Sequence, residues 1–154
     1  MDTLLGLRPT VRRPRRVSLI AGPSAAAEAR SQVRAAIHAW DVPADPDIAV
    51  VLTSELVTNA LQHEVGETIT LTITCVCDQL RVDVHDSSDC MPALKDAPVD
   101  AESGRGLMLV ASLSAEWGFY PTTLGKAVYF TLMSPDNPHE VGRPQPTGDR
   151  TWVR

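Results

Sequence analysis

The chain has 154 residues, of which 44% are hydrophobic, and its formal net charge is −5. This length suits one domain around a single core and leaves little room for a second. The charge is uneven, because residues 1–16 carry a net charge of +4 and the remainder −9. An acidic body lacks the continuous basic face that binds nucleic acid, so no direct contact with nucleic acid is expected.

No apolar stretch approaches the roughly 20 residues that span a bilayer, and the N-terminal leucines are too few for a signal-peptide core. We therefore expect a cytoplasmic protein without membrane contact. The three cysteines, Cys75, Cys77 and Cys90, are an odd number, which disfavours a disulfide framework. Cys75 and Cys77 stand two apart on an expected strand, so they should face the same side as small buried hydrophobic residues.

A single domain is predicted at residues 15–133, between a disordered basic arm at 1–14 and a disordered proline-rich tail at 134–154. Its helices and hairpins follow one another in an order that is typical of an α+β fold. We expect a two-layer sandwich with a mostly antiparallel sheet and three helices on one face.

The first half of the domain is predicted to contain a strand, two helices and a hairpin. The strand covers 15–20, and the helix after it ends at Trp40, with the Ser24 hydroxyl as its cap. The second helix begins at Asp45 or Asp47 and ends near His63. The hairpin strands are expected at 67–76 and 80–86, with a tight connection at Asp78–Gln79.

The second half begins with a long loop at 87–105, and loops of this length inside a compact domain are often functional lids. A third helix is predicted to start near Gly106. Two further strands are expected at 115–120 and 126–133, joined by a turn at 122–125.

The second helix carries Glu55, Asn59 and His63 at four-residue spacing, so they project from one side. Ile48, Val51 and Leu52 are predicted to share this side. A carboxylate and an amide on an apolar face are costly unless they are paired or bound to an ion. Their hard oxygen atoms suit Mg²⁺ held together with substrate phosphates, and the carboxylate could deprotonate an attacking hydroxyl. A helix end emerging into solvent, or a core amide bonded to the backbone, is the alternative explanation.

Two further motifs suggest contacts with a ligand. Asp86 ends a strand and could accept a hydrogen bond from an exocyclic amine, although strands often end in Asp before a turn. The segment Gly104-Arg105-Gly106-Leu107 opens a helix, where free amides and the helix dipole attract an anion. A plain junction between loop and helix would also explain it. The dinucleotide-binding fingerprint does not fit, because the long loop and not a strand precedes the glycines.

Taken in order, these motifs are more specific than any one of them. The segments E-L-V-T-N-A (55–60), Asp86, G-R-G-L (104–107) and G-K-x-V (125–128) resemble the N-box, G1 box, G2 box and late strand of the GHKL ATPase superfamily. Over roughly residues 17–133 the chain is most similar to small bacterial regulators of the anti-sigma factor serine/threonine kinase type. The resemblance implies the histidine kinase-like (Bergerat) fold with an ATP lid.

The resemblance also implies that the chain binds ATP and Mg²⁺. Glu55 would be the catalytic base for a substrate serine, Asn59 would bind Mg²⁺ and the nucleotide, and Asp86 would accept the adenine amine. The other implied nucleotide-binding residues are His63, Ser88, Gly104, Arg105, Gly106, Leu107 and Lys126.

Two features depart from the family pattern. The G1 box usually reads D-x-G-x-G, but Asp86 is followed here by Ser87, Ser88, Asp89 and Cys90, which reduces backbone freedom near the adenine. Ala127 stands where a threonine hydroxyl is expected to support the adenine contact.

The leading hypothesis is an ATP-dependent serine/threonine protein kinase that acts in transcription regulation. It would bind or phosphorylate a protein partner, either a sigma factor or an anti-sigma-antagonist protein, and a homodimer is a family expectation. The alternative is a non-catalytic module of the same fold that senses ATP or docks a partner without ATP. The missing glycines favour the docking module, whereas the Glu55–Asn59 pair favours catalysis.

Overall fold

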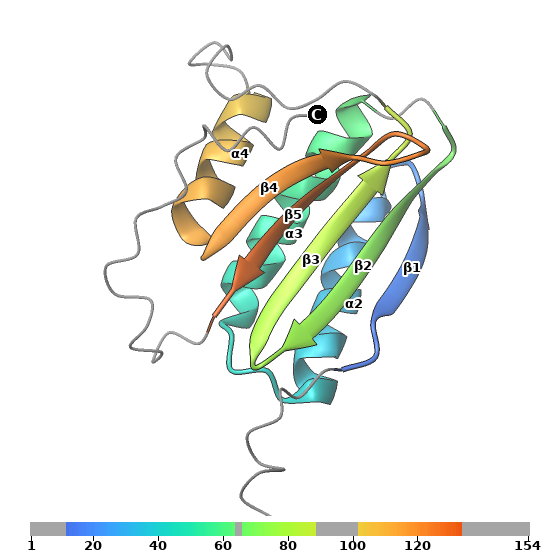
Figure 1. Ribbon diagram of the computed structural model, residues 1–154. Helices are drawn as coiled ribbons and strands as arrows, with labels where there is room; N and C mark the ends of the chain where they lie inside the picture. Colours follow the sequence, from blue (N-terminus) through green and yellow to red (C-terminus); the bar gives the residue numbers. More distant parts are fainter. Residues whose placement is uncertain (1–11, 64–65, 89–101, 134–154) are drawn as a thin grey trace, which may run out of the picture.

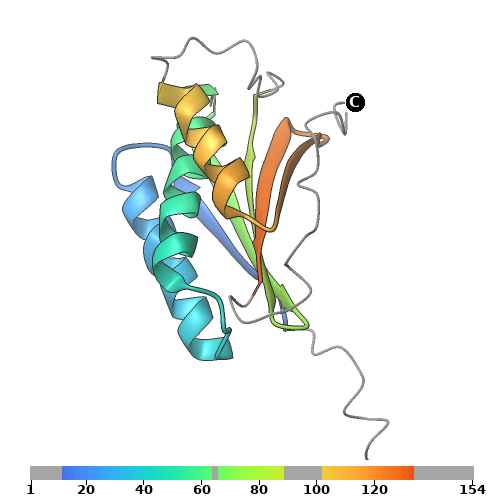
Figure 2. The same ribbon diagram turned by 90° about the vertical axis from the view of Figure 1, so that its left-hand side faces the viewer.

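The computed structural model describes residues 12–63, 66–88 and 102–133. These residues form a two-layer sandwich of a five-stranded antiparallel sheet, in the order β1-β2-β3-β5-β4, with three helices on one face (Figures 1 and 2). The predicted fold class is therefore confirmed. The elements are β1 (Arg15–Ile20), α2 (Ala25–Trp40), α3 (Pro46–His63), β2 (Thr68–Val76), β3 (Gln79–Asp86), α4 (Glu102–Leu113), β4 (Glu116–Pro121) and β5 (Lys126–Leu132).

Several predictions fall on residues outside the described ranges. These are Cys90, most of the expected lid, the proline-rich tail and the basic arm up to residue 11. At the described end of the arm, the Arg12 amide donates a hydrogen bond to the Cys75 carbonyl at 3.1 Å.

Helix α3 begins with a side-chain cap. Oδ1 of Asp45 accepts hydrogen bonds from the amides of Asp47 at 2.9 Å and Ile48 at 3.4 Å. Pro46 is the first helical residue, where its fixed φ suits the helix and its missing amide is not needed. The predicted start of this helix near Asp45 is thereby confirmed.

Helix α2 begins differently from the prediction. Ser24 has a helical backbone conformation and its side chain makes no capping hydrogen bond. The hydroxyl can reach the first free amides only from an extended conformation, so the predicted cap is wrong. A backbone bond from the Ala25 amide to the Gly22 carbonyl forms the turn instead. The helix ends at Trp40, and the next residue, Asp41, has a left-handed φ of 52° that lets its amide reach the carbonyls of the last turn.

The β2–β3 hairpin has a two-residue turn, one position earlier than predicted. Val76 pairs with Gln79, and Cys77 and Asp78 between them have φ values of 51° and 63°. Two positive φ values give the twist that joins antiparallel strands tightly. The expectation that Cys75 and Cys77 share a buried face is wrong, because Cys77 lies in the turn and is exposed while Cys75 is buried.

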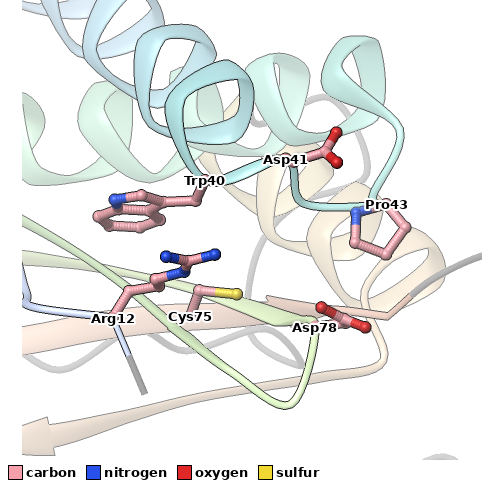
Figure 3. Close-up of a pocket in the computed structure, with 6 residues that line it drawn as sticks. All are labelled: Arg12, Trp40, Asp41, Pro43, Cys75 and Asp78. Atoms are coloured by element: carbon pink, nitrogen blue, oxygen red, sulfur yellow. The ribbon is translucent and has the colours of Figure 1, made fainter. Parts of the chain in front are cut away.

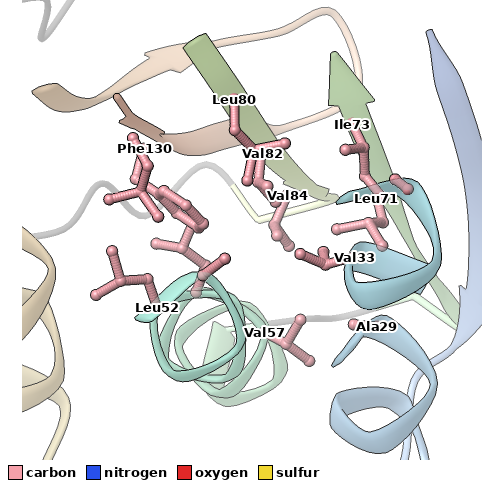
Figure 4. Close-up of a cluster of buried hydrophobic side chains, with 14 of the residues drawn as sticks. Ala29, Val33, Leu52, Val57, Leu71, Ile73, Leu80, Val82, Val84 and Phe130 are labelled. Atoms are coloured by element: carbon pink, nitrogen blue, oxygen red, sulfur yellow. The ribbon is translucent and has the colours of Figure 1, made fainter. Parts of the chain in front are cut away.

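The hydrophobic core lies between the sheet and helices α2 and α3 (Figure 4). On the helix-facing side of β3 and β5, directly opposed apolar residues form successive pairs: Leu80–Leu132, Val82–Phe130 and Val84–Val128. The next pair along the same side is Asp86–Lys126. A line of apolar pairs therefore ends in a charged pair that is still inside the sandwich.

Helix α4 begins at Glu102, four residues before the predicted start at Gly106. Gly104 and Gly106 thus lie within its first turns and not in the loop before it. Residues 102–109 contain no proline or β-branched residue, and the Gly104 amide lies among the first four, which need no acceptor within the helix, so the two glycines are tolerated there. Helix α4 packs against α3, which stabilises its helical state.

Candidate nucleotide site

Three of the sequence motifs lie at one end of the domain. Figures 1 and 2 show that the C-terminal end of α3, the end of β3 and the beginning of α4 are at the same end of the sandwich. Helix α3 contacts both α4 and β3. Strand β5 begins at this end too, because Lys126 pairs with Asp86. The fold therefore gathers segments that are far apart in the sequence, such as 55–60 and 125–128.

Asn59 has a polar atom without a partner in the interior. Its side chain is buried, with 4% exposed, and among the described residues its Oδ1 has no hydrogen-bond partner. Leaving a buried acceptor unpaired costs about 1–3 kcal/mol, so such an atom often has a ligand. Glu55, one turn earlier, is half-buried. Of the apolar residues predicted to share their side, Leu52 is buried but Val51 is 42% exposed.

Asp86 is closed off by other groups of the chain. Its Oδ2 lies 2.6 Å from Nζ of Lys126, and both side chains are fully buried. Its Oδ1 accepts a hydrogen bond of 2.9 Å from the amide of Ser88, which is also buried. Both oxygen atoms of the predicted adenine-binding carboxylate are thus engaged within the protein.

Gly125 holds the start of β5 close to the end of β3. A Cβ at this position would overlap the carbonyl oxygen of Asp86 and would lie 2.6 Å from the carbonyl carbon of Ser87. Its amide donates to Oγ1 of Thr122 at 3.0 Å, which fixes the turn between β4 and β5. No other residue type fits this approach, and the approach places Lys126 directly opposite Asp86.

The structure corrects the significance given to Ala127. Successive residues of a strand face opposite sides of a sheet, and Ala127 pairs with His85 on the side away from the helices. A threonine hydroxyl at this position would therefore face away from Asp86. The residue that faces the Asp86 carboxylate is Lys126, so the predicted contact is one position out of register.

The comparison with known families agrees with this arrangement. Residues 19–132 match the profile of the family described as histidine kinase-like ATPase domain, which is well over half of the chain. The chain belongs to this family. The histidine kinase-like ATPase domain described here is also similar in structure to the crystal structure of the RsbU and RsbW domains of Rv1364c from Mycobacterium tuberculosis.

That structural similarity has a TM-score of 0.59 and a sequence identity of 22%, and it covers 79% of this chain and 32% of the other. The ATPase domain thus spans about a third of the length of that crystallised chain, and the likeness supports the fold. No curated protein sequence matches the chain. In the described part of the chain, none of the helices is both long and apolar enough to cross a bilayer.

Membership of an ATPase family implies a site for ATP, and the two sides of the candidate site fit a metal–nucleotide complex differently. The unpaired Oδ1 of Asn59 is a hard oxygen of the kind that Mg²⁺ prefers, so this side fits the metal and phosphates. The Asp86 side does not fit the predicted adenine amine, because the carboxylate is fully buried and Lys126 already donates to it.

The remaining predicted residues are only partly described. His63 is the last residue of α3, and residues 104–107 lie in the first turns of α4, but the structure describes the backbone and not the side chains at these positions. The first turns of α4 nevertheless place free backbone amides at the same end of the domain as the C-terminal end of α3, the helix that carries Asn59, as an anion site requires (Figure 2).

The ATPase domain has a separate cavity of about 470 Å³ near the β2–β3 turn (Figure 3). It is lined by Arg12, Trp40, Asp41, Pro43, Cys75 and Asp78. Strand β3 runs from this turn to Asp86, so the cavity lies roughly 25 Å from the Asp86 carboxylate at about 3.3 Å per residue. It is not part of the candidate nucleotide site.

A cluster of aromatic and charged side chains covers the helix-free face of the sheet. Arg81 binds Asp83 through two hydrogen bonds of 2.8 and 2.9 Å, and its guanidinium lies 4.0 Å from the ring centre of Tyr129. Tyr120 donates to Asp83 at 2.8 Å, and burial, together with this bond, raises the pKa of Tyr120 to about 12. Burial lowers the pKa of His85, which contacts Tyr120 edge-on. Such contacts between strands stabilise the sheet behind the site.

Proposed function

We propose that this histidine kinase-like ATPase domain is an ATP-binding regulatory protein of the anti-sigma factor serine/threonine kinase type. Its partner would be a sigma factor, an anti-sigma-antagonist protein, or both. The observation that carries the proposal is the buried, unpaired Oδ1 of Asn59 with Glu55 one helical turn away. The structural similarity to a protein that contains an RsbW domain supports the choice of class.

Each group would have a defined part in this function. Asn59 would hold Mg²⁺, which neutralises phosphate charge when bound. Glu55 would accept the proton of a serine hydroxyl during phosphoryl transfer, a reaction that depends mainly on positioning and charge neutralisation. The first turns of α4 would offer amides to the phosphates. The further residues proposed for nucleotide contact are His63, Ser88, Gly104, Arg105, Gly106 and Leu107, whereas Lys126, also expected from the sequence to bind nucleotide, is buried against Asp86.

The binding of Mg-ATP tests the metal side of this proposal. Isothermal titration calorimetry should show binding that EDTA abolishes, and Asn59→Ala should weaken it at least tenfold because the metal loses an oxygen ligand. Thr58→Ala is the matched control, since Thr58 is the exposed neighbour on the same helix. If no nucleotide binds at millimolar concentration, or if both variants behave alike, Asn59 does not hold the metal.

Phosphate transfer to a candidate partner tests the catalytic side. Glu55→Ala should lower the transfer rate by about 10²–10⁴-fold, the usual contribution of a positioned base, while leaving Mg-ATP affinity nearly unchanged. Glu28→Ala removes an exposed carboxylate from α2 and should leave the rate at the wild-type value. Transfer that continues undiminished in Glu55→Ala excludes this residue as the base.

A second candidate function is favoured by the closed Asp86 carboxylate. A domain whose adenine-binding group is already occupied could regulate a partner by docking alone, either sensing ATP weakly or not using it. This candidate predicts that a partner is bound with the same affinity in the presence and absence of Mg-ATP. The kinase proposal predicts that Mg-ATP changes that affinity, so one titration of a candidate partner distinguishes them.

A further inference from the structure

We propose that Lys126 is an internal substitute for the adenine amine, so that this site binds a purine nucleotide without reading the 6-amino group. The proposal rests on the proposed nucleotide-binding function and concerns only the base side of that site. It follows from how the Asp86 carboxylate is engaged, buried and held in place.

The first step is the match between the two donors. An adenine amine would present an N–H group to Asp86, and the Lys126 ammonium presents an N–H group to the same carboxylate at 2.6 Å. A hydrogen bond from a charged donor is about twice as strong as one from a neutral donor. In direct competition for Asp86, the ammonium therefore displaces the amine.

The second step is burial. Neither the Asp86 nor the Lys126 side chain has any exposed surface, and Oδ1 of Asp86 is already bonded to the Ser88 amide. To reach the carboxylate, a base would have to move a buried ammonium away from its counter-ion. Separating such a pair costs several times what one neutral hydrogen bond returns, so the nucleotide does not drive the exchange.

The third step is the rigidity of the backbone that carries Lys126. Asp86 and Lys126 are directly opposed on paired strands, and the close approach of Gly125 to Ser87 leaves no room to shift the start of β5. The Asp86–Lys126 pair comes next after Val84–Val128 in the line of paired core residues on β3 and β5. Lys126 is thus fixed as a specificity-determining residue and does not behave as a mobile surface cation.

The experiment compares Mg-ATP with the Mg complex of purine riboside triphosphate, which lacks only the 6-amino group. For the wild-type chain we expect the two dissociation constants to agree within about twofold, because the amine is not read. Lys126→Met removes the competing ammonium and leaves the carboxylate without a donor on Oδ2, and we expect this variant to bind ATP about tenfold more tightly than the analogue, the effect of one hydrogen bond to a charged group. A tenfold preference of the wild-type chain for ATP would overturn the proposal, as would equal binding of both by folded Lys126→Met.

A second variant guards against misfolding of Lys126→Met. The double variant Asp86→Leu/Lys126→Met replaces the buried pair by apolar groups of similar size, which such sites often tolerate. It should fold, as shown by circular dichroism, and should bind both nucleotides equally. A preference for ATP in this variant would show that the amine is read elsewhere and would overturn the proposal.

The failure of this proposal differs from the failure of the proposed function. If the wild-type chain binds neither triphosphate, the kinase function fails. The proposal about recognition of the purine is then decided by Lys126→Met. ATP-specific binding gained by that variant supports the role of Lys126, whereas continued absence of binding overturns it. If both triphosphates bind and the wild-type chain prefers ATP, the kinase function stands and only the proposal about recognition of the purine fails.

Discussion

Gly125 is in backbone contact with Ser87, and a Cβ at position 125 would lie 2.6 Å from the carbonyl carbon of Ser87. This distance is shorter than any normal contact of a side chain, and the neighbouring atoms are backbone, which cannot turn aside. The contact joins the turn between β4 and β5 to the segment that leaves β3. It therefore links folding stability to the geometry of the candidate site.

We predict that Gly125→Ala lowers the free energy of unfolding by about 1–3 kcal/mol, the usual cost of overpacking. Urea denaturation followed by circular dichroism measures the change. Gly22→Ala is the matched control, because a Cβ at that glycine meets no atom within 4 Å, and it should shift stability by less than about 0.5 kcal/mol. Equal effects of the two substitutions would show that the close approach at Gly125 is not required.

The buried ion pair gives a second prediction, about stability. Lys126→Met leaves the Asp86 carboxylate buried without its counter-ion, and we expect a loss of about 3–5 kcal/mol at pH 7. The double variant Asp86→Leu/Lys126→Met should recover most of this loss, because apolar groups need no partner. Denaturant midpoints of the three chains measure both steps. A double variant that is no more stable than Lys126→Met would mean that the pair itself contributes the stability.

His85 gives a prediction about acid. Burial, the largest cause, lowers the pKa of His85 below its ordinary value of 6.5, and Arg16 and Arg81 act in the same direction against Asp83 and Asp86. The folded state thus favours the neutral ring, so its contribution to stability is present above pH 6.5 and is lost as the pH falls below that value. Between pH 7 and 5 the wild-type chain should lose more stability than His85→Gln, as urea midpoints at both pH values would show. Parallel losses would contradict this.

Tyr120 gives the corresponding prediction in alkali. Its pKa is raised from 10 to about 12, first by burial and then by its hydrogen bond to Asp83. The folded state favours the protonated phenol, so this stability is present below pH 10 and is lost as the pH rises from 10 to about 12. Tyr120→Phe should be less stable at pH 8 by about 1 kcal/mol, the value of one hydrogen bond, and should depend less on pH above 10. Thermal unfolding at pH 8, 10 and 11 measures both effects.

The sequence predicts the fold well because the spacing of apolar residues and the positions of proline, glycine and capping residues indicate the same elements along most of the domain. The strand at 15–20, the end of the first helix at Trp40 and the start of the second near Asp45 are all confirmed. The predicted turn is one residue away from Cys77–Asp78, because neither residue is a glycine and positive φ values are rarely adopted by other types. The predicted cap at Ser24 rests on residue type alone, which does not determine its backbone conformation.

The site is less predictable from the sequence, because it depends on register between strands that are far apart in the chain. Asp86 and Lys126 are both expected to bind nucleotide, but only the pairing of β3 with β5 shows that they bind each other. The alternation along β5 could have predicted that Lys126 is buried, because Val128 and Phe130 face the core and Lys126 shares their side of the strand. The sequence places Asn59 correctly on α3, but it cannot show that its Oδ1 has no partner among the described residues.

The hairpin turn at Cys77 and Asp78 has a further consequence. The left-handed conformation costs a residue such as Cys77 about 1–2 kcal/mol, whereas Asp78 tolerates it better, so the turn at this end of β3, remote from Asp86, is less stable than it could be. An Asn-Gly pair at these two positions would recover part of it without touching any residue proposed to bind nucleotide. Stability can therefore be raised at this end of β3 without any change near Asp86, which lies at the other end of the same strand.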